Sequence, residues 1–301
     1  MVCLREFEPS PTPLLFTAGE LMVERHARHP EHLGAGGAAA NAALAFIRAG
    51  GRAVFACRLA EDEHRPFLVA ELERVGLASP AVLLGGPFNA VYTIGAGCPY
   101  GRFGYHRQGS AGGGLAPGDI EREKVAEADV VLVSGVFACL NETTRATADF
   151  LVGSAGPGAL VAYDVNHRPA LASPERAREV YEELSPLLTF VKADLDEARL
   201  IWGSGSPLEV SRRGAERHPH ILITLGGDGL ILVADGEAAA VPAVPSVCAD
   251  PTGAGDAALG ACLFHLARGG SPEVAARAAA DAGALCVRHL GAWGYTRTAR
   301  R

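Results

Sequence analysis

Short apolar runs and longer helical segments alternate in the first part of the chain. Residues 14–17 and 53–57 are apolar runs too short for helices, and they predict two strands. Between them, residues 38–48 are rich in alanine and free of glycine and proline, which predicts a helix. A second helix is expected over 66–75. This order of strand, helix, strand and helix is typical of an α/β protein.

Two stretches interrupt this alternation. Residues 24–35 are polar and rich in histidine, which predicts an exposed loop or a small flap. Residues 81–105 consist of short β-type pieces separated by Gly and Pro, which predicts a small sheet outside the main layer. We therefore expect a β lid formed by about 20–35 and 88–108.

From residue 129 onward, strands and helices alternate regularly. Such alternation builds a parallel sheet with helices on both faces. The expected elements are strands at 130–133, 159–163, 189–192 and 221–224, a hairpin over 230–243, and helices at 143–153, 174–187, 194–202, 254–268 and 272–290. Residues 1–301 are thus predicted to form a single three-layer α/β/α domain with a mostly parallel central sheet and the β lid.

Composition narrows the class of protein. Apolar residues make up 49% of the chain and charged residues 20%, as in a globular protein. The formal net charge is −7 without a basic block, which argues against a nucleic-acid partner. No apolar stretch is long enough to span a membrane, and the start does not resemble a signal peptide. Seven cysteines without a C-x-x-C pair fit a reducing cytoplasm better than zinc or a disulfide framework.

The segment 250–256, Asp-Pro-Thr-Gly-Ala-Gly-Asp, has the strongest potential for chemistry. Gly253 and Gly255 permit a tight turn, and the small apolar residues that follow predict a helix. Unpaired N–H groups at a helix start bind anions, and the Asp256 carboxylate beside them is placed to accept a proton. Taken alone, the segment fits a glycine-rich turn with an Asp cap better than an active site.

A second segment makes the catalytic interpretation stronger. Residues 250–256 resemble the C-terminal signature of the ribokinase-like (PfkB) carbohydrate kinases, and residues 36–43, Gly-Gly-Ala-Ala-Ala-Asn-Ala-Ala, resemble their sugar-binding segment. The resemblance implies a ribokinase-like fold and an ATP-dependent kinase in which Asp256 is the base. It also implies that Gly253, Ala254 and Gly255 hold the γ-phosphate, and that the sugar contacts Gly36, Gly37 and Asn41.

Two further segments resemble the nucleotide and metal motifs of that family. Residues 194–197, Asp-Leu-Asp-Glu, are similar to its Asn-x-x-Glu motif, which implies that Asp194 and Glu197 hold Mg²⁺ through water. Asp194 replaces the usual Asn. The strand and loop over 224–229 resemble the nucleotide-binding loop. The residues implied in ATP binding are Asn166, Asp194, Thr224, Gly226, Gly229, Gly253 and Gly255.

The substrate is indicated by two arginine-containing segments. Residues 105–111 and 164–169 resemble segments of the 2-keto-3-deoxygluconate kinases, and fructokinases share the second. In the former enzymes the matching arginines contact the sugar acid, because a guanidinium binds a carboxylate through two parallel hydrogen bonds. The residues implied here are Tyr92, Tyr105, Arg107 and Arg168.

Other functions stay open at this point. Glu24 stands where ribokinases carry an Asp that binds sugar hydroxyls, and it would repel an acid, so a neutral-sugar fructokinase or ribokinase is the alternative substrate class. A catalytically silent regulator that binds sugar or nucleotide is the alternative of a different class, although the retained Asp256 argues against it. The resemblance also implies a homodimer formed through the lid.

Some patterns are set aside. Residues 34–39 match G-x-G-x-x-A but do not follow a strand, so a dinucleotide site is not expected, and no P-loop motif occurs. His26, His29 and His32 recur at equal spacing and fit an exposed flap better than a metal site. Trp202 and Trp293 are expected to be packing residues.

Overall fold

The fold centres on one large, mostly parallel sheet. The computed structural model describes residues 10–79, 81–95 and 103–297. Within these residues the sheet has nine strands in the order β13-β12-β11-β10-β9-β8-β1-β4-β5. Neighbouring strands are parallel from β5 to β11, and β12 and β13 are antiparallel. The strands are β1 (Leu14–Ala18), β4 (Arg52–Leu59), β5 (Val82–Leu84), β8 (Val130–Ser134), β9 (Leu160–Asp164), β10 (Phe190–Asp194), β11 (His220–Thr224), β12 (Leu230–Ala234) and β13 (Glu237–Val241).

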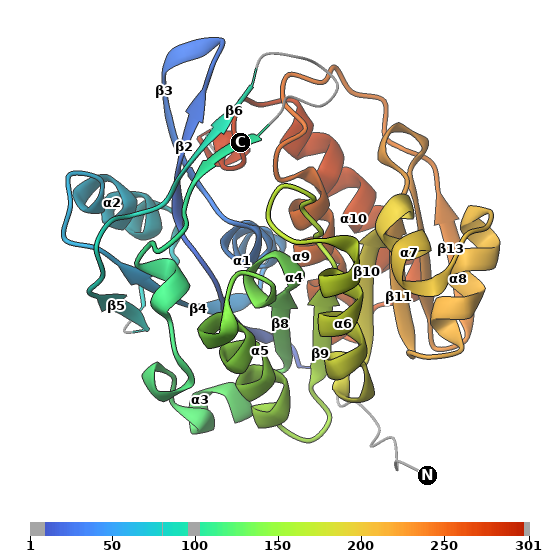
Figure 1. Cartoon of the computed structure of the whole chain (residues 1–301). Helices are drawn as coiled ribbons and strands as arrows, with labels where there is room; N and C mark the ends of the chain where they lie inside the picture. The colour runs from blue at the N-terminus through green and yellow to red at the C-terminus, as the bar shows by residue number, and fades with distance from the viewer. Residues whose placement is uncertain (1–9, 80, 96–102, 298–301) are drawn as a thin grey trace.

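Helices cover both faces of this sheet, as the alternating pattern predicts. In Figure 1, α5 and α6 cover the near face, and α1 and α9 lie behind the sheet. One face carries α1 (Ala38–Ala49), α2 (Arg65–Val75), α9 (Ala254–Ala267) and α10 (Pro272–Val287). The other carries α3 (Arg122–Ala126), α4 (Gly135–Ala138), α5 (Glu142–Ser154), α6 (Pro174–Leu184), α7 (Leu195–Trp202) and α8 (Pro207–Ala215).

Alternate residues of each central strand belong to different cores. In β8, Val130 and Leu132 pack on the side of α1 and α9, and Val131 and Val133 pack on the opposite side. Because a parallel sheet is buried on both faces, its strands are continuous apolar runs in the sequence. The same alternation directs side chains at the ends of β9 and β10 toward α9. These end positions are polar, whereas the earlier positions of the strands on that side are apolar.

A second sheet has four strands in the order β3-β2-β6-β7. It stands at the top of the molecule in Figure 1. Its strands are β2 (Met22–His26), β3 (His29–Gly36), β6 (Val91–Ile94) and β7 (Phe103–His106). The small sheet expected within 81–105 is confirmed for β6 and β7.

Two details differ from the sequence prediction. The segment 24–35 is largely strand rather than loop, because β2 pairs with both β3 and β6, and long-range pairing outweighs its polar composition. Residues 82–84 belong to the large sheet, since β5 pairs with Cys57–Leu59 of β4. The single-domain organisation of residues 1–301 stays a prediction. No helix in the described residues is long and apolar enough to cross a membrane.

The contact between α1 and α9 brings two site residues together. Asn41 lies in the first turn of α1 and Asp256 in the first turn of α9. One turn beyond Asp256, Gly260 faces α1 so closely that a Cβ would collide with the carbonyl oxygen of Ala42. The absence of a side chain at Gly260 therefore lets the two helices approach near the site.

We expect Gly260→Ala to lower the free energy of unfolding by about 1–3 kcal/mol, because α1 and α9 must separate to admit the methyl group. Gly153→Ala is the matched control, since this helical glycine of α5 is exposed and has open space around its Cβ position. The control should gain up to about 1 kcal/mol from helix propensity. Chemical denaturation measures both changes, and an unchanged stability of Gly260→Ala would contradict the packing described.

Candidate active site

A large cavity opens at the carboxyl ends of β9, β10 and β11, where α9 begins. Its volume is about 960 Å³, enough for a nucleotide and a small substrate. Predicted site residues line it: Asn166, Arg168, Asp194, Glu197, Thr224, Gly226, Gly229, Gly253, Ala254, Gly255 and Asp256. Parallel-sheet proteins bind ligands at this edge, because strand ends and helix starts meet there.

Asp256 is buried at the floor of this cavity and is held from two sides. Its Oδ2 accepts a hydrogen bond from Asn41 Nδ2 at 2.8 Å, and its Oδ1 accepts one from Asn166 Nδ2 at 3.2 Å. Burial raises the pKa of the Asp256 carboxyl, and the nearby Asp164 carboxylate raises it further, while Lys192 and Asn41 act in the opposite direction. The result is an oriented carboxylate with increased proton affinity, which suits a general base.

Asn41 is positioned by the start of α1. Gly37 precedes the helix with φ 157°, and a Cβ at Gly37 would collide with the carbonyl oxygen of Glu20. The backbone N–H of Gly37 donates to Asn41 Oδ1 at 3.3 Å. The glycine predicted for close sugar approach is thus also required by packing within the chain.

Asn166 connects Asp256 to a buried ion pair. Its backbone is left-handed, with φ 42°, and its Nδ2 also donates to Asp164 Oδ2 at 2.9 Å. Asp164 Oδ1 in turn pairs with Lys192 Nζ at 2.9 Å. The family resemblance implies a nucleotide-binding role for Asn166, and the structure places Asn166 against the Asp164 and Asp256 carboxylates as well as in the cavity lining.

Lys192 was missed by the sequence analysis. It is buried and lines the cavity, and a Cβ on Gly255 would lie 3.3 Å from its Nζ. Burial alone would lower the pKa of its ammonium, but Asp164, Glu197 and Asp256 outweigh burial, so the pKa is raised and the charge is kept. The available signal was a charged residue in the middle of the otherwise apolar first four residues of β10.

The start of α9 lies next to this cation. Gly253 precedes the helix with φ 81°, and no side chain caps the helix. The first-turn N–H groups and the Lys192 ammonium therefore lie together, in an arrangement suited to a phosphoryl group.

The acidic residues at the start of α7 form a capping box. Asp194 Oδ1 accepts from Glu197 N, and Glu197 Oε2 accepts from Asp194 N, both at 2.8 Å. Glu197 Oε1 accepts from His167 N at 2.7 Å. Burial raises the pKa of Glu197 to about 7, with Lys192 acting against the shift.

These carboxylates fit a hydrated divalent metal better than a directly coordinated one. Both oxygens of Glu197 already accept backbone hydrogen bonds, while Asp194 is exposed in the cavity lining. Among the described residues, no group of three or more His, Cys, Asp and Glu side chains has metal-binding geometry. Mg²⁺ keeps several water ligands, so water between the ion and these oxygens matches the donor set.

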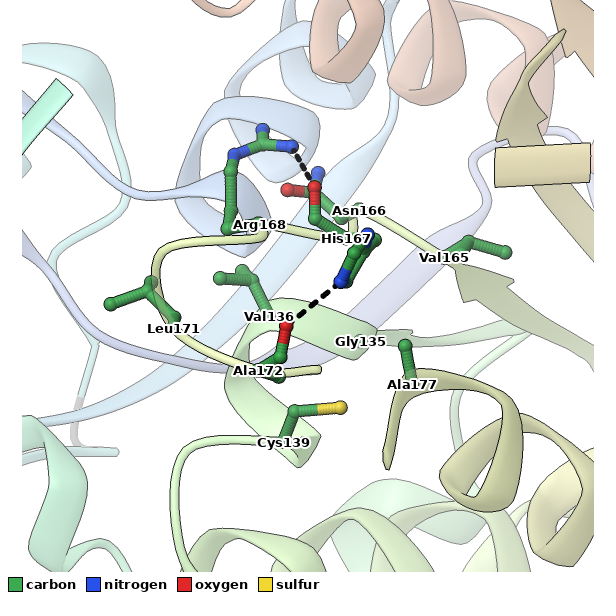
Figure 2. A pocket seen from close by; sticks show the side chains of 10 residues that line it. All are labelled: Gly135, Val136, Cys139, Val165, Asn166, His167, Arg168, Leu171, Ala172 and Ala177. Atoms are coloured by element: carbon green, nitrogen blue, oxygen red, sulfur yellow. Dashed lines mark hydrogen bonds between the residues drawn. The ribbon is translucent and has the colours of Figure 1, made fainter. Parts of the chain in front are cut away.

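Arg168 follows β9 in a loop drawn in Figure 2. The His167 side chain turns back, and its Nε2 lies 2.9 Å from the Ala172 carbonyl oxygen. Arg168 extends from the other side of the loop, away from Cys139. The hollow beneath the loop has a volume of about 10 Å³, too small for a sugar. Arg168 itself lines the large cavity, with 37% of its side chain exposed and 3.9 Å between its Nη1 and Glu197 Oε1.

Arg107, the other predicted acid-binding arginine, has a carboxylate partner within the chain. Its side chain is only 4% exposed and forms an ion pair with Glu20, which also accepts from Ser110 Oγ at 2.5 Å. Its guanidinium carbon lies 5.6 Å from the ring centroid of Tyr105. Neither residue is part of the cavity lining.

Tyr92 and Glu24 are engaged with each other. Tyr92 donates from its hydroxyl to Glu24 Oε2 at 2.5 Å, and the backbone N–H of Ala292 donates to the same oxygen at 3.0 Å. His32 Nε2 lies 2.9 Å from Glu24 Oε1. The Gly36 backbone is packed against the Tyr92 hydroxyl. This cluster ties the small sheet to the C-terminal segment rather than opening into the cavity.

Comparisons with known proteins agree with this geometry. Residues 17–296 match the family described as pfkB family carbohydrate kinase. The 2-dehydro-3-deoxygluconokinase of Thermoproteus tenax is 28% identical over 259 residues, covering 83% of this chain and 78% of that protein. Fructokinase-1 of Oryza sativa subsp. japonica is 30% identical over 236 residues, covering 77% and 73%.

Solved structures show the same fold. A fructokinase of Vibrio cholerae, bound to fructose, ADP and a calcium ion, superimposes with a TM-score of 0.81 at 22% identity, covering 94% of this chain and 95% of that one. The large sheet, the small sheet and the flanking helices are therefore ribokinase-like. With the family matching nearly the whole described chain, this protein belongs to the pfkB family of carbohydrate kinases and is an ATP-dependent sugar kinase.

Proposed function

We propose that this kinase transfers the γ-phosphate of ATP to the primary hydroxyl of a 2-keto-3-deoxy sugar acid, with 2-keto-3-deoxygluconate as the first substrate to test. The observation that carries the acid assignment is Arg168, a partly exposed guanidinium in the lining of the cavity that contains Asp256. The similarity to a kinase named for that substrate supports the same choice.

Asp256 acts as the base in this proposal. The acceptor hydroxyl would lie against its carboxylate and lose its proton to it as the oxygen attacks the γ-phosphorus in line with the leaving ADP oxygen. Asn41 and Asn166 orient the carboxylate. Its raised pKa makes it a better proton acceptor than an exposed aspartate.

Charge on the transferring phosphoryl group is met by the start of α9 and by Lys192. The N–H groups of Gly253, Ala254 and Gly255 are proposed to bind the phosphoryl oxygens, and the Lys192 ammonium beside Gly255 adds a fixed positive charge in a buried site. Because Asp164 pairs with Lys192, the ammonium is held in place before ATP binds.

The nucleotide is proposed to lie along Thr224, Gly226 and Gly229, which line the same cavity. Asp194 and Glu197 would hold Mg²⁺ through water, and the bound ion neutralises phosphate charge. Homodimerisation through the small sheet stays a proposal carried by the family resemblance, and a cytoplasmic location stays a proposal carried by the cysteine pattern.

A neutral sugar is the second candidate, and the Arg107–Glu20 pair favours it. An arginine whose charge is balanced within the protein offers a substrate carboxylate little net attraction. The similarity to a plant fructokinase points in the same direction.

Replacing Arg168 by Met separates the two substrate classes. If Arg168 binds the carboxylate, we expect the variant to lose at least about tenfold in kcat/KM for 2-keto-3-deoxygluconate, the cost of one charge-assisted hydrogen bond. Its kcat/KM for fructose and ribose should change little. Steady-state assays of the wild type and the variant on the three sugars measure this.

Arg107→Met is the matched control. It breaks a buried ion pair and should cost about 3–5 kcal/mol of stability without a selective effect on acids. A wild-type enzyme that prefers fructose or ribose, or an Arg168→Met enzyme with unchanged preference, would contradict the sugar-acid proposal.

The role of Lys192 is tested by a pair of variants. Lys192→Met should be both inactive and unstable, because it leaves Asp164 buried without a partner. Adding Asp164→Asn removes that unpaired charge and should restore the melting temperature, but kcat should stay lower by at least about a hundredfold if the ammonium stabilises the phosphoryl group. Thermal unfolding and kcat are measured on both proteins. A double variant with near wild-type kcat would show that Lys192 only balances Asp164.

A further inference from the structure

The C-terminal segment 291–293 makes three hydrogen bonds around the start of α1 and the turn before α9. The backbone N–H of Gly291 donates to Asp250 Oδ2 at 2.9 Å, and that of Ala292 donates to Glu24 Oε2 at 3.0 Å. The third contact is a side chain: Trp293 Nε1 donates to Asn41 Oδ1 at 2.8 Å. The sequence analysis expected Trp293 to be a packing residue, and this bond gives it a second role.

The chemistry of the indole fixes which way the Asn41 amide faces. An indole N–H can only donate, so it selects the carbonyl oxygen of the amide as its partner. With Oδ1 turned to Trp293, the Nδ2 of Asn41 faces Asp256 Oδ2, to which it donates at 2.8 Å. The opposite orientation would place the carbonyl oxygen against the carboxylate and the amide nitrogen against the indole N–H, and both contacts are repulsive.

We propose that Trp293 is a positioning residue for phosphoryl transfer, whose indole N–H fixes the Asn41 amide so that Asp256 is oriented toward the acceptor hydroxyl. The proposal rests on the role of Asp256 as the base. Trp293 is 2% exposed and is not part of the cavity lining, so it acts through Asn41 and not by touching substrate.

The remaining bonds of Asn41 would hold its amide less firmly. Without the indole donor, Oδ1 retains the longer bond of 3.3 Å from the Gly37 N–H. The amide then gains freedom to rotate, and its hydrogen bond to Asp256 weakens. We expect a loss of about tenfold in kcat, the rate equivalent of one hydrogen bond.

The same change should appear in the pH dependence of the reaction. The hydrogen bond from Asn41 favours the ionised carboxylate of Asp256, so weakening it should raise the pKa of that group further. The base must be ionised to work, and activity is lost as pH falls through its pKa. The acid limb of kcat/KM should therefore move to higher pH. The other titratable groups facing Asp256 are Asp164, Lys192, Arg168, Cys286, Tyr92 and Tyr295, and the substitution leaves all of them in place.

The most specific variant replaces only the N–H group of the indole ring. β-(3-Benzothienyl)alanine has the shape of tryptophan with sulfur in place of the N–H, so it removes the donor and keeps the packing. The chain contains two tryptophans, and Trp202→Phe leaves position 293 as the only one to be replaced by the analogue. Trp202→Phe alone is the matched control, because Trp202 donates to the Tyr181 hydroxyl at 2.8 Å in the other core.

We expect the control to keep the wild-type kcat and pH profile. The analogue should show the tenfold lower kcat, the acid limb moved upward, and a KM for ATP within about twofold of the control, since Trp293 is not part of the cavity lining. An analogue protein with the kcat and acid limb of the control would overturn the proposal. A wild-type profile without any acid limb would instead remove Asp256 as the base, so the two failures are distinguishable.

A spectroscopic readout keeps the proposal testable if the analogue protein does not fold. In ¹⁵N-labelled Trp202→Phe protein, the one indole N–H resonance belongs to Trp293. It should shift as Asp256 titrates, over the same pH range as the acid limb, because Asn41 links the two groups. An indole resonance that is indifferent to pH across that range would overturn the link.

Discussion

The hydrogen bond from Asn41 to Asp256 is the interaction on which the active site depends. It joins the first turns of two helices whose starts are far apart in the chain, so every feature that sets the distance between α1 and α9 also sets the geometry of the proposed base, Asp256. Gly260 permits the close approach, Gly37 lets the chain enter α1, and Trp293 orients the amide. The site is thus a product of core packing as much as of its polar residues.

Charge balance is the second constraint. Asp164 and Asp256 are buried close together, and a single buried ammonium, Lys192, interacts with both. Two carboxylates that share one cation cannot both be fully stabilised as anions. Burial raises the pKa of the Asp256 carboxyl, and the Asp164 carboxylate raises it further, against the opposing effect of Lys192. In a kinase this is useful, because a base must accept a proton at neutral pH and pass it on after transfer.

The features that could be predicted from the sequence are those determined by residues close together in the chain. Alternating apolar segments indicated the parallel sheet, and the glycine-rich turn before Asp256 indicated the start of a helix, because periodicity and turn chemistry act over a few residues. Lys192 was missed because its meaning comes from Asp164 and Gly255, which are neighbours only in space. Trp293 was taken as packing for the same reason. Arg107 was expected to meet a substrate carboxylate, and the Glu20 that pairs with it lies 87 residues earlier, in the connection between β1 and β2.

Catalysis is proposed to depend on Asp256 as the group that removes the proton from the acceptor hydroxyl. Single-turnover phosphoryl transfer by Asp256→Asn tests it most directly, because Asn has the same shape and keeps hydrogen-bonding capacity but cannot act as a base. We expect a rate lower by about 10²–10⁴-fold, with ATP affinity within about twofold of the wild type. A variant that transfers phosphate at a rate near that of the wild type would contradict it.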